Sequence, residues 1–368
     1  MKTNHLAIAM VLALIPAGSG APGRAAEDPT RVLAVRNDAA YPRNGEGDII
    51  ELKDGRLALV YTRFASGTDD ATSADLAMRT SADLGRTWSE PRTLVPNEGR
   101  RNVMSVSLLR ERKTGNILVF YLRKNNPDND CILYLRRSSD ELASVGDPTR
   151  CLPLDGYQVV NNDRVIQLRR GRLLVAAAHH TDAAGKFTAK GIPISYFSDD
   201  GGASWRAGTP VLALGTVPEI TMQEPGLVEL EDGRVWMFMR TPHGYQYGCT
   251  SSDAGKTWTK PEPIRDLASP NSPATIERLP WTGDLVCVWN DHGGWHYFPA
   301  PNKRTPMALS ISTDEGRTWS RSRVLDGDPE ASYCYTSMTF TAGHMILSYY
   351  GPGGLRVMTL PRDWVLKQ

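Results

Sequence analysis

The pattern S-x-D-x-G-x-x-W occurs four times in the chain and limits the possible folds more than any other feature. The copies lie at residues 81–88, 198–205, 251–258 and 312–319, and a degenerate copy at 138–142 lacks the Gly and the Trp. Asp can accept hydrogen bonds from backbone N–H groups ahead of it, Gly tolerates a positive φ, and Trp packs its ring against a neighbour. The pattern therefore predicts a recurrent hairpin turn. It contains no nucleophile and no set of metal ligands.

A second repeat, a pair of short strands around a turn containing Gly, occurs six times between these copies. The pairs are rich in Val, Ile, Leu and Tyr, as strands are, and their turn glycines stand 50 to 62 residues apart. The pairs span 48–63, 103–123, 164–180, 224–240, 274–290 and 336–350, with turns at Gly55, Gly115, Gly171, Gly233, Gly283 and Gly343.

One such pair together with the pair around each Asp-containing turn makes a four-stranded sheet, and six such sheets in a ring make a propeller. We therefore expect an all-β fold, a six-bladed β-propeller with four-stranded antiparallel blades, formed as one domain by residues 27–368. The last blade lacks a full second pair of strands. We expect the segment near residues 31–35 to complete it and close the ring.

The first 26 residues have the pattern of a secretory signal peptide. Lys2 and His5 precede an apolar stretch at 6–15, and small residues follow at 19–21. The stretch is shorter than the roughly 20 residues that span a bilayer. We expect cleavage before the domain begins and a secreted or periplasmic protein with no membrane insertion afterwards. An uncleaved N-terminal anchor is the alternative.

Charge and cysteine content exclude several classes of function. The chain has 42 Lys and Arg against 41 Asp and Glu, without a basic run, which argues against a nucleic-acid partner. The five cysteines fit no metal-ligand spacing, and we expect no metal and no cofactor. Cys131 and Cys151 are close enough in sequence to form a disulfide in an exported protein, but buried free thiols are an equal alternative.

The turn glycines also predict which residues share a face of the propeller. If the first strand of each blade descends to its Gly and the second returns, residues equidistant from the Gly meet at the upper face. This brings Glu224, Arg240 and Tyr335 together, and the long connections 64–75 and 291–306 lie at the same face. The Asp-containing turns fall on the lower face. We therefore expect a ligand pocket on the axis at the upper face.

The four copies of S-x-D-x-G-x-x-W match the Asp box of the sialidase (neuraminidase) superfamily, whose members are six-bladed propellers. Residues 223–240, QEPGLVELEDGRVWMFMR, also resemble the family's fourth blade, E-x-x-x-V-E-L-x-D-G-x-x-x-x-x-x-R. The resemblance covers essentially the whole mature chain. It implies three catalytic residues: Tyr335 as the nucleophile that opens blade six, Glu224 as its base, and Asp69 as the acid/base before the first box.

The resemblance also implies substrate-binding residues, but blade one departs from the family. Sialidases begin this blade with an Arg in the context Phe/Tyr-Arg-Ile-Pro, and the corresponding position here falls near Gly45. Arg43 could reach the site from a shifted loop, or Glu46 could occupy it, where a carboxylate would repel an anionic sugar. The run 161–164, NNDR, is polar at the top of blade three. The candidate substrate-binding residues are Arg240, Arg304, Arg43, Glu46, Asp70, Asp163 and Arg164.

The implied activity is an exo-α-sialidase that hydrolyses terminal sialic acids from glycoconjugates with retention. Arginines suit the carboxylate of a sialoside, because a guanidinium is permanently charged and forked. A Tyr nucleophile avoids bringing an anion to an anionic centre, and it needs an adjacent base because its pKa is near 10. Two alternatives stay open: a sialidase-like hydrolase or lyase acting on another sugar, and a non-catalytic glycan-binding propeller.

Overall fold

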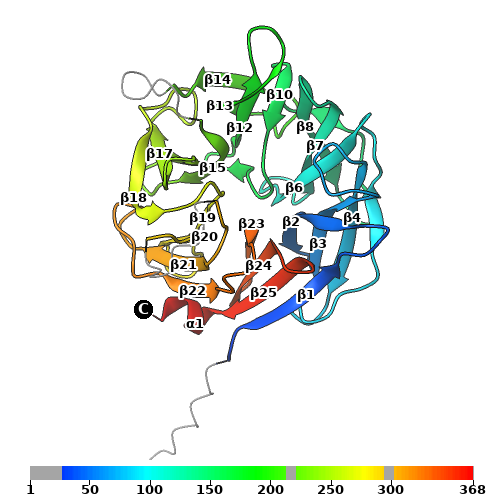
Figure 1. The fold of residues 1–368 in the computed structure, drawn as a ribbon, viewed down its shortest axis with the longest axis vertical. Coiled ribbons are helices and arrows are strands. Elements are labelled where there is room, and N and C mark those ends of the chain that lie inside the picture. The colour runs from blue at the N-terminus through cyan, green and yellow to red at the C-terminus, as the bar shows by residue number, and fades with distance from the viewer. Residues whose placement is uncertain (1–26, 213–220, 294–301, 368) are drawn as a thin grey trace, which may run out of the picture.

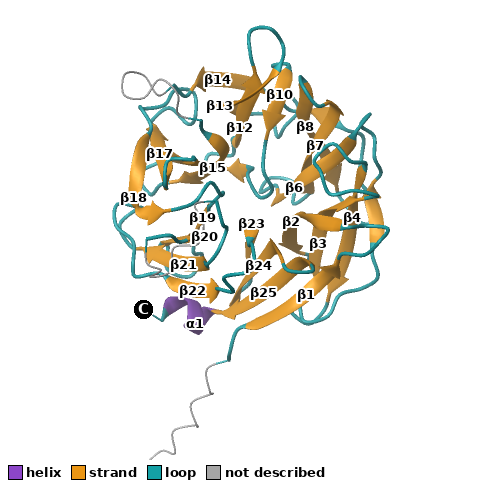
Figure 2. Ribbon diagram, in the orientation of Figure 1, coloured by secondary structure: helices purple, strands orange, loops and turns teal. Residues whose placement is uncertain are grey.

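The protein is an all-β structure, as the strand repeats predict. The computed structural model describes residues 27–212, 221–293 and 302–367, and the predicted leader at 1–26 lies outside these residues. Strands account for nearly all regular structure, and the single helix in these ranges, α1 (Arg362–Leu366), is at the C-terminal end (Figure 2). No helix in the described part of the chain is long and apolar enough to cross a membrane.

Five sheets, antiparallel except for one strand pair, surround a common centre, with strands β2, β6, β15, β19 and β23 innermost (Figure 1). Four of the sheets have four strands, each adjacent to the next in the chain except at β1. They are β2 (Arg43–Glu51), β3 (Leu57–Phe64), β4 (Ala74–Ser81) and β5 (Arg92–Val95); β15 (Gln223–Glu229), β16 (Val235–Arg240), β17 (Tyr245–Ser251) and β18 (Glu262–Ala268); β19 (Thr275–Arg278), β20 (Leu285–Asn290), β21 (Met307–Ser312) and β22 (Arg323–Asp326); and β23 (Cys334–Phe340), β24 (His344–Gly351), β25 (Gly354–Pro361) and β1 (Thr30–Arg36).

The fifth sheet has nine strands and joins two groups. Strand β10 pairs in parallel with β8 and antiparallel with β12, so it links the group β6–β9 to the group β11–β14. The inner strand β11 is only two residues long. The strands are β6 (Asn102–Arg110), β7 (Ile117–Asn126), β8 (Asp130–Ser138), β9 (Thr149–Arg150), β10 (Gly156–Val159), β11 (Ile166–Gln167), β12 (Leu173–Thr181), β13 (Phe187–Ser198) and β14 (Arg206–Pro210).

The N-terminal strand β1 closes the ring against the C-terminal strand β25, which confirms the expectation for residues 31–35. The pairing is antiparallel, with Thr30 opposite Thr359 and Arg36 opposite Gly354. Strands from the two ends of the chain therefore lie in one sheet (Figure 1). This pairing links the ends of the described chain without a covalent bond.

Three of the S-x-D-x-G-x-x-W segments connect the third and fourth strands of a four-stranded sheet, and the copy at 198–205 connects β13 to β14. In the copy at 251–258, the Ser251 hydroxyl donates to Asp253 and accepts from Gly255 N, both at 2.8 Å. Asp253 also accepts from the backbone N and the hydroxyl of Thr257, at 2.9 and 2.7 Å. Ala254 and Gly255 both have positive φ, 58° and 88°. The segment is therefore a turn held by its own side chains, as predicted.

The box glycines lie where successive sheets meet. A Cβ at Gly255 would approach Leu174 of β12 to 2.6 Å, and one at Gly316 would approach Trp236 of β16 to the same distance. The box Trp rings add to these contacts: Trp205 packs edge-on against Phe120 of β7 at 6.2 Å between ring centroids. The repeats thus support the ring by packing, and they carry no chemistry.

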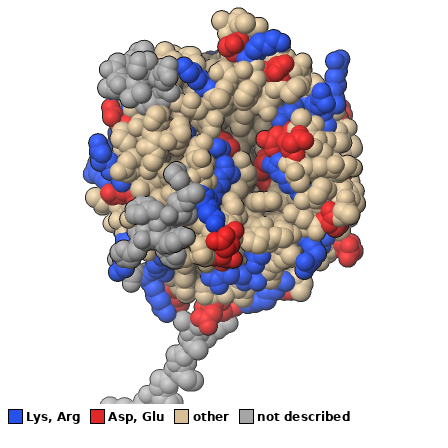
Figure 3. Space-filling model, in the orientation of Figure 1, with Lys and Arg blue, Asp and Glu red and all other residues tan. Residues whose placement is uncertain are grey.

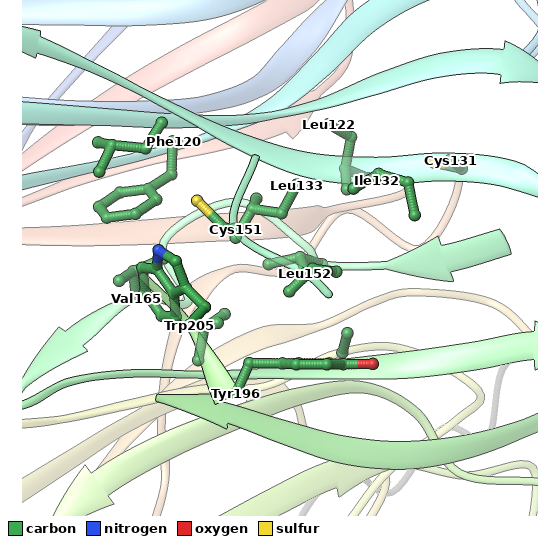
Figure 4. Close-up of a cluster of buried hydrophobic side chains, with 14 of the residues drawn as sticks. Phe120, Leu122, Cys131, Ile132, Leu133, Cys151, Leu152, Val165, Tyr196 and Trp205 are labelled. Carbon is green, nitrogen blue, oxygen red and sulfur yellow. The ribbon is translucent and has the colours of Figure 1, made fainter. Parts of the chain in front are cut away.

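Buried side chains between the sheets form the core, and all five cysteines belong to this buried interior as free thiols. Figure 4 shows Cys151 among Phe120, Leu133 and Trp205, in the cluster between the two halves of the nine-stranded sheet. Burial raises the pKa of the Cys151 thiol well above its ordinary value. The suggested disulfide between Cys131 and Cys151 is therefore absent, and the alternative of buried thiols holds.

Candidate active site

Four inner strands carry a bulge at the same place, and each bulge contains a residue with positive φ. The residues are Glu46 in β2 (φ 48°), Ser105 in β6 (57°), Glu224 in β15 (47°) and Tyr335 in β23 (57°), and the strand register shifts across each of them. A bulge redirects its side chain, and a left-handed conformation of a residue other than Gly is strained. Strain at equivalent points of four strands makes the axis the candidate functional region.

The side chains of Tyr335 and Glu224 meet across the axis. The Tyr335 hydroxyl donates to Oε1 of Glu224 at 3.4 Å, and Glu224 is 8% exposed. Burial and then the charge of Glu224 raise the pKa of Tyr335 above its ordinary value. Burial also acts to raise the pKa of Glu224, but Arg240 and Arg304 outweigh it and hold that pKa below its usual range. A neutral phenol therefore faces an ionised carboxylate.

Two arginines stand beside this pair, and Asn271 connects them. Arg240 at the end of β16 donates to Oε2 of Glu224 at 2.8 Å and to Oδ1 of Asn271 at 2.6 Å. Arg304 donates to the Asn271 carbonyl at 3.4 Å, and its guanidinium lies 5.3 Å from the centre of the Tyr335 ring. Within the described ranges, Arg304 takes part in no ion pair, whereas Arg240 pairs with Glu224. The charge of Arg304 is therefore less neutralised than that of Arg240.

Arg43 reaches the site from the first residue of β2 and is held by two carboxylates. Its guanidinium lies 2.5 Å from Glu46 and 2.5 Å from Asp70, and it stacks over the Phe64 ring at 4.2 Å. Glu46 also accepts a hydrogen bond from the Ser105 hydroxyl. Its pKa is raised by burial, although Arg43 opposes this. Arg43 and Glu46 are the two candidates for the position at which the first strand pair departs from the sialidase pattern. Both are thus present at the site, where they form an ion pair.

Gly45 stands near the position where the sialidase pattern has an arginine, and a side chain there has little room. A Cβ at Gly45 would lie 3.2 Å from Cδ2 of Tyr350, which is closer than most real Cβ contacts. A side chain at this position would crowd the ring of Tyr350. Arg43 therefore supplies a guanidinium from a position where the chain has room for one.

The loop between β3 and β4 presents Asp70, and not Asp69, to this ion pair. The Asp69 carboxylate accepts from the backbone N of Ala71 at 2.7 Å, and this bond and that from Thr72 lower its pKa. The Asp70 carbonyl accepts from the side chains of Asn102 and Lys124, at 2.8 and 2.7 Å. The loop is therefore fixed with Asp70 toward Arg43 and Asp69 in a local turn. The role predicted for Asp69 stays a prediction.

Asp163 and Arg164 lie in the buried interior below the pocket, where backbone groups of other sheets bind them. The backbone N of Met338 donates to Asp163 at 2.9 Å. Arg164, 2% exposed, donates to the Ala274 carbonyl at 2.8 Å. They also line a cavity of about 660 Å³ with Asp48 and Glu277. The substrate contacts predicted for these two residues stay untested, and the observed contacts are structural.

That cavity lies away from Tyr335, on the side of the inner-strand turns. Burial, and next the charge of Asp163, raise the pKa values of Asp48 and Glu277 well above their ordinary range. Crowding of this kind favours the protonated form of a carboxyl group. No group of three or more His, Cys, Asp or Glu is arranged to hold a metal ion in the part of the chain that the structure describes.

The counting of positions from the turn glycines missed several residues of the site. Ser105 stands ten residues before Gly115, close to the nine between Glu224 and Gly233, so the same count could have found it. Lys124, Asn102 and Asn271 act through contacts between sheets, for which the sequence has no local signal.

Figure 3 shows the face hollowed near its centre, with acidic and basic side chains on the walls of the hollow.

Comparisons with known proteins identify the family and the fold of the chain. A family described as the BNR repeat-like domain matches residues 64–346. The chain belongs to this family, within the sialidase superfamily. The chain is also 26% identical over 360 residues to a sialidase of Micromonospora viridifaciens, covering 90% of this chain and 54% of that protein. It thus spans about half the length of this curated relative.

Several solved structures share the fold of this chain. A protein of unknown function from Dyadobacter fermentans matches with a TM-score of 0.70 and 19% identity, covering 90% of this chain and 99% of that one. The intramolecular trans-sialidase of Ruminococcus gnavus, in complex with oseltamivir carboxylate, matches with a TM-score of 0.69 and 14% identity over 90% and 96%. Trypanosoma rangeli sialidase matches with a TM-score of 0.67 and 16% identity, covering 92% of this chain and 60% of that one. At these identities the likeness concerns the fold alone.

Proposed function

We propose that this chain is an exo-α-sialidase that hydrolyses terminal sialic acids from glycoconjugates with retention of configuration. The observation that carries the proposal is the hydrogen bond of Tyr335 to Glu224 within a site that also contains Arg240 and Arg304. The phenol is buried and neutral, its acceptor is ionised, and guanidinium groups stand beside both. This set suits a substrate that carries a carboxylate on its anomeric carbon.

The proposal includes a six-bladed propeller. The nine-stranded sheet is then two four-stranded blades, β6–β9 and β11–β14, which β10 connects. With the four separate sheets this makes six blades. The inner-strand bulges support this division, because they recur once in each of four blades at the position that borders the axis.

In the proposed mechanism, the substrate carboxylate binds Arg304 and Arg240, with Arg43 as a third contact. The Tyr335 oxygen attacks the anomeric carbon while Glu224 takes the phenolic proton, and the glycosidic C–O bond breaks. An acid protonates the departing oxygen and then takes a proton from the water that cleaves the tyrosyl–sugar bond. Two inversions at one carbon give net retention.

The geometry favours Asp70 over Asp69 as this acid. Asp70 is held beside Arg43 by contacts to its own backbone carbonyl. The Asp69 carboxylate is engaged by the backbone N of Ala71 in a local turn, whereas the Asp70 carboxylate contacts Arg43. Both residues remain candidates until they are substituted separately.

The test is the release of free sialic acid from a fluorogenic aryl sialoside by the purified protein. Turnover by the wild type, its loss in Tyr335→Phe, and a product of retained α configuration by NMR would support the proposal. No turnover of any α2,3-, α2,6- or α2,8-linked sialoside would overturn it. Binding of sialosides without turnover, unchanged in Tyr335→Phe, would indicate the non-catalytic alternative.

A second candidate is a glycosidase of the same design that acts on a different sugar. The specific observation in its favour is that two carboxylates, Glu46 and Asp70, offset the charge of Arg43. A substrate without a carboxylate would need less positive charge at the site. A panel of aryl glycosides of neutral and other acidic sugars, assayed beside the sialoside, distinguishes the two candidates.

Export is also part of the proposal. It rests on the signal-peptide pattern of residues 1–26. N-terminal sequencing of the protein recovered outside the cytoplasm tests it, with a mature N-terminus between residues 21 and 27 as the expected result.

A further inference from the structure

The polar run at residues 161–164 crosses the axis and contacts four other inner segments. The backbone N of Asp163 donates to the Val106 carbonyl at 3.0 Å, and that of Arg164 donates to the Ser107 hydroxyl at 2.9 Å. The side chains of Asp163 and Arg164 reach Met338 and Ala274. We call these four residues the axial segment. The inner strand that follows it, β11, has only two residues. The axial segment occupies the place that a longer inner strand would fill.

Asn162 makes the contacts that concern the chemistry. Its side-chain Nδ2 donates to the Gly47 carbonyl at 2.9 Å and to the Tyr335 carbonyl at 3.0 Å. Asn162 is fully buried. One amide therefore holds two peptide groups that belong to strands on different sides of the axis.

Both of these peptide groups lie at strained bulges. Tyr335 itself has a φ of 57°, and Gly47 follows Glu46, whose φ is 48°. The ladder of hydrogen bonds is interrupted at each point, between Cys334 and Ser337 and between Gly45 and Asp48. A bulge persists only where the surroundings hold it. The side-chain donor to the Tyr335 carbonyl is the amide of Asn162, and at the Gly47 carbonyl the same amide, at 2.9 Å, is joined by the more distant Ser348 hydroxyl, at 3.3 Å.

We infer that Asn162 is a positioning residue for the reaction: it fixes the bulge that directs the Tyr335 hydroxyl toward Glu224, and it couples that bulge to the one that carries Glu46. The inference rests on the proposed function in assigning Tyr335 as the nucleophile. Asn162 lies on the main-chain side of Tyr335, and both hydrogen bonds of its Nδ2 go to carbonyl groups, so it acts through the backbone.

The adjacent Asn161 provides a matched control. It belongs to the same segment and is 2% exposed, against 0% for Asn162. The Nδ2 atom of Asn161 has no hydrogen-bond partner. Replacing it removes the same functional group from the same segment without removing a contact to Tyr335 or Gly47.

The experiment compares Asn162→Leu, which keeps nearly the same volume and loses both donors, with Asn161→Leu. We expect kcat on an aryl sialoside to fall on the order of 100-fold in Asn162→Leu, because a nucleophile displaced by about 1 Å loses that much. KM should change less than threefold, because Arg240 and Arg304 are held by Asn271. Asn161→Leu should keep kcat within about threefold. Equal losses in both variants, or a change confined to KM, would overturn the inference.

Crystal structures of both variants provide a reading that does not depend on turnover. The distance from the Tyr335 hydroxyl to Oε1 of Glu224 should lengthen in Asn162→Leu and stay near 3.4 Å in Asn161→Leu. If the wild type hydrolyses no sialoside, the proposed function fails, and this distance still decides the positioning role. If Asn162→Leu does not fold, Asn162→Asp, with the same shape and one carboxylate in place of the amide, serves in both measurements. An undisturbed Tyr335 in the folded variant would refute the inference.

Discussion

The hydroxyl of Tyr335 lies 3.4 Å from Oε1 of Glu224, while Oε2 of the same carboxylate accepts from Arg240 at 2.8 Å. Glu224 thus has one oxygen for the phenol and one for the guanidinium. The guanidinium keeps the carboxylate ionised in spite of its burial, so that it can accept a proton. Both Tyr335 and Glu224 stand at bulges with positive φ, which places the reactive pair on strained backbone.

Substituting the nucleophile gives the first prediction. Tyr335→Phe should reduce kcat on an aryl sialoside about 1000-fold or more, because the covalent route is lost. Its free energy of unfolding should change by only about 1 kcal/mol, the net value of one hydrogen bond. Tyr333→Phe is the control, since the ring of Tyr333 packs against Tyr349 at 6.3 Å and should leave kcat unchanged. Steady-state kinetics and urea unfolding measure both quantities, and comparable kcat losses in the two variants would contradict the assignment.

The charge of Glu224 predicts where activity is lost in acid. Because the pKa of Glu224 lies below 4.5, the acid limb of kcat/KM should fall below pH 4.5. The stabilising effect of its ionised form is present above the unfolded pKa and is lost as the pH falls through the lower folded pKa. Arg240→Gln should move the acid limb to higher pH and raise KM, because Arg240 is the largest influence that opposes burial. Arg304→Gln should move it less, and a limb that does not move in Arg240→Gln would disprove the argument.

The two neighbouring aspartates can be separated by the leaving group of the substrate. A general acid matters most when the departing oxygen is a poor leaving group, as in a natural glycan, and contributes about 100- to 10,000-fold there. Asp70→Asn should therefore lose far more activity on sialyllactose than on an aryl sialoside. Asp69→Asn should change the two rates equally. The opposite pattern would give the role to Asp69.

How far the sequence predicted this site depends on the regularity of the strands. Glu224, Arg240 and Tyr335 were found by their distance from turn glycines, because the rise per residue of a strand is constant. Ser105 follows the same rule. Arg43 was ambiguous because its place is decided by the room beside Tyr350, which no local pattern encodes. Asp163 lies at the level of the blade for which it was predicted. Because β11 is only two residues long, however, Asp163 belongs to the axial segment and not to an inner strand.

The ion pair between Arg43 and Glu46 leads to a prediction on stability. Burial raises the pKa of Glu46, and Arg43 is the main opposing influence. Arg43→Ala should therefore raise this pKa further and cost about 3 kcal/mol of unfolding free energy at pH 7, because it leaves a buried charge unpaired. The cost should shrink as the pH falls through the raised pKa of Glu46 in the variant, where the carboxyl takes up a proton, and it should be smallest at pH 4.

The double variant Arg43→Ala/Glu46→Gln should recover most of that loss. Arg63→Ala is a suitable comparison, because its partner Asp75 is 21% exposed and can be hydrated, so its cost should vary less with pH. Chemical unfolding at pH 4, 5.5 and 7 measures these differences. If the loss in Arg43→Ala is independent of pH, or if Glu46→Gln does not relieve it, the ion pair does not stabilise the site in this way.

The last prediction concerns the degenerate box at 138–142. Substitution by Gly should have opposite effects on the free energy of unfolding at Leu142 and at Ala254. Leu142 stands where the other boxes have Gly, and it has a φ of 66° while being fully buried in the core. Leu142→Gly relieves about 1–2 kcal/mol of backbone strain but removes a buried side chain, which costs about 3–5 kcal/mol. It should therefore lower the free energy of unfolding by about 2 kcal/mol.

Ala254→Gly relieves the same kind of strain, at a φ of 58°, and removes only one methyl group. The relief exceeds the entropy that a Gly adds to the unfolded chain, about 0.4–1 kcal/mol. Ala254→Gly should therefore stabilise the protein slightly, by about 0.5 kcal/mol. Urea unfolding of the two variants beside the wild type tests both signs. A stabilised Leu142→Gly would mean that the left-handed conformation costs more than the buried side chain contributes, and would reverse this explanation of the missing Gly.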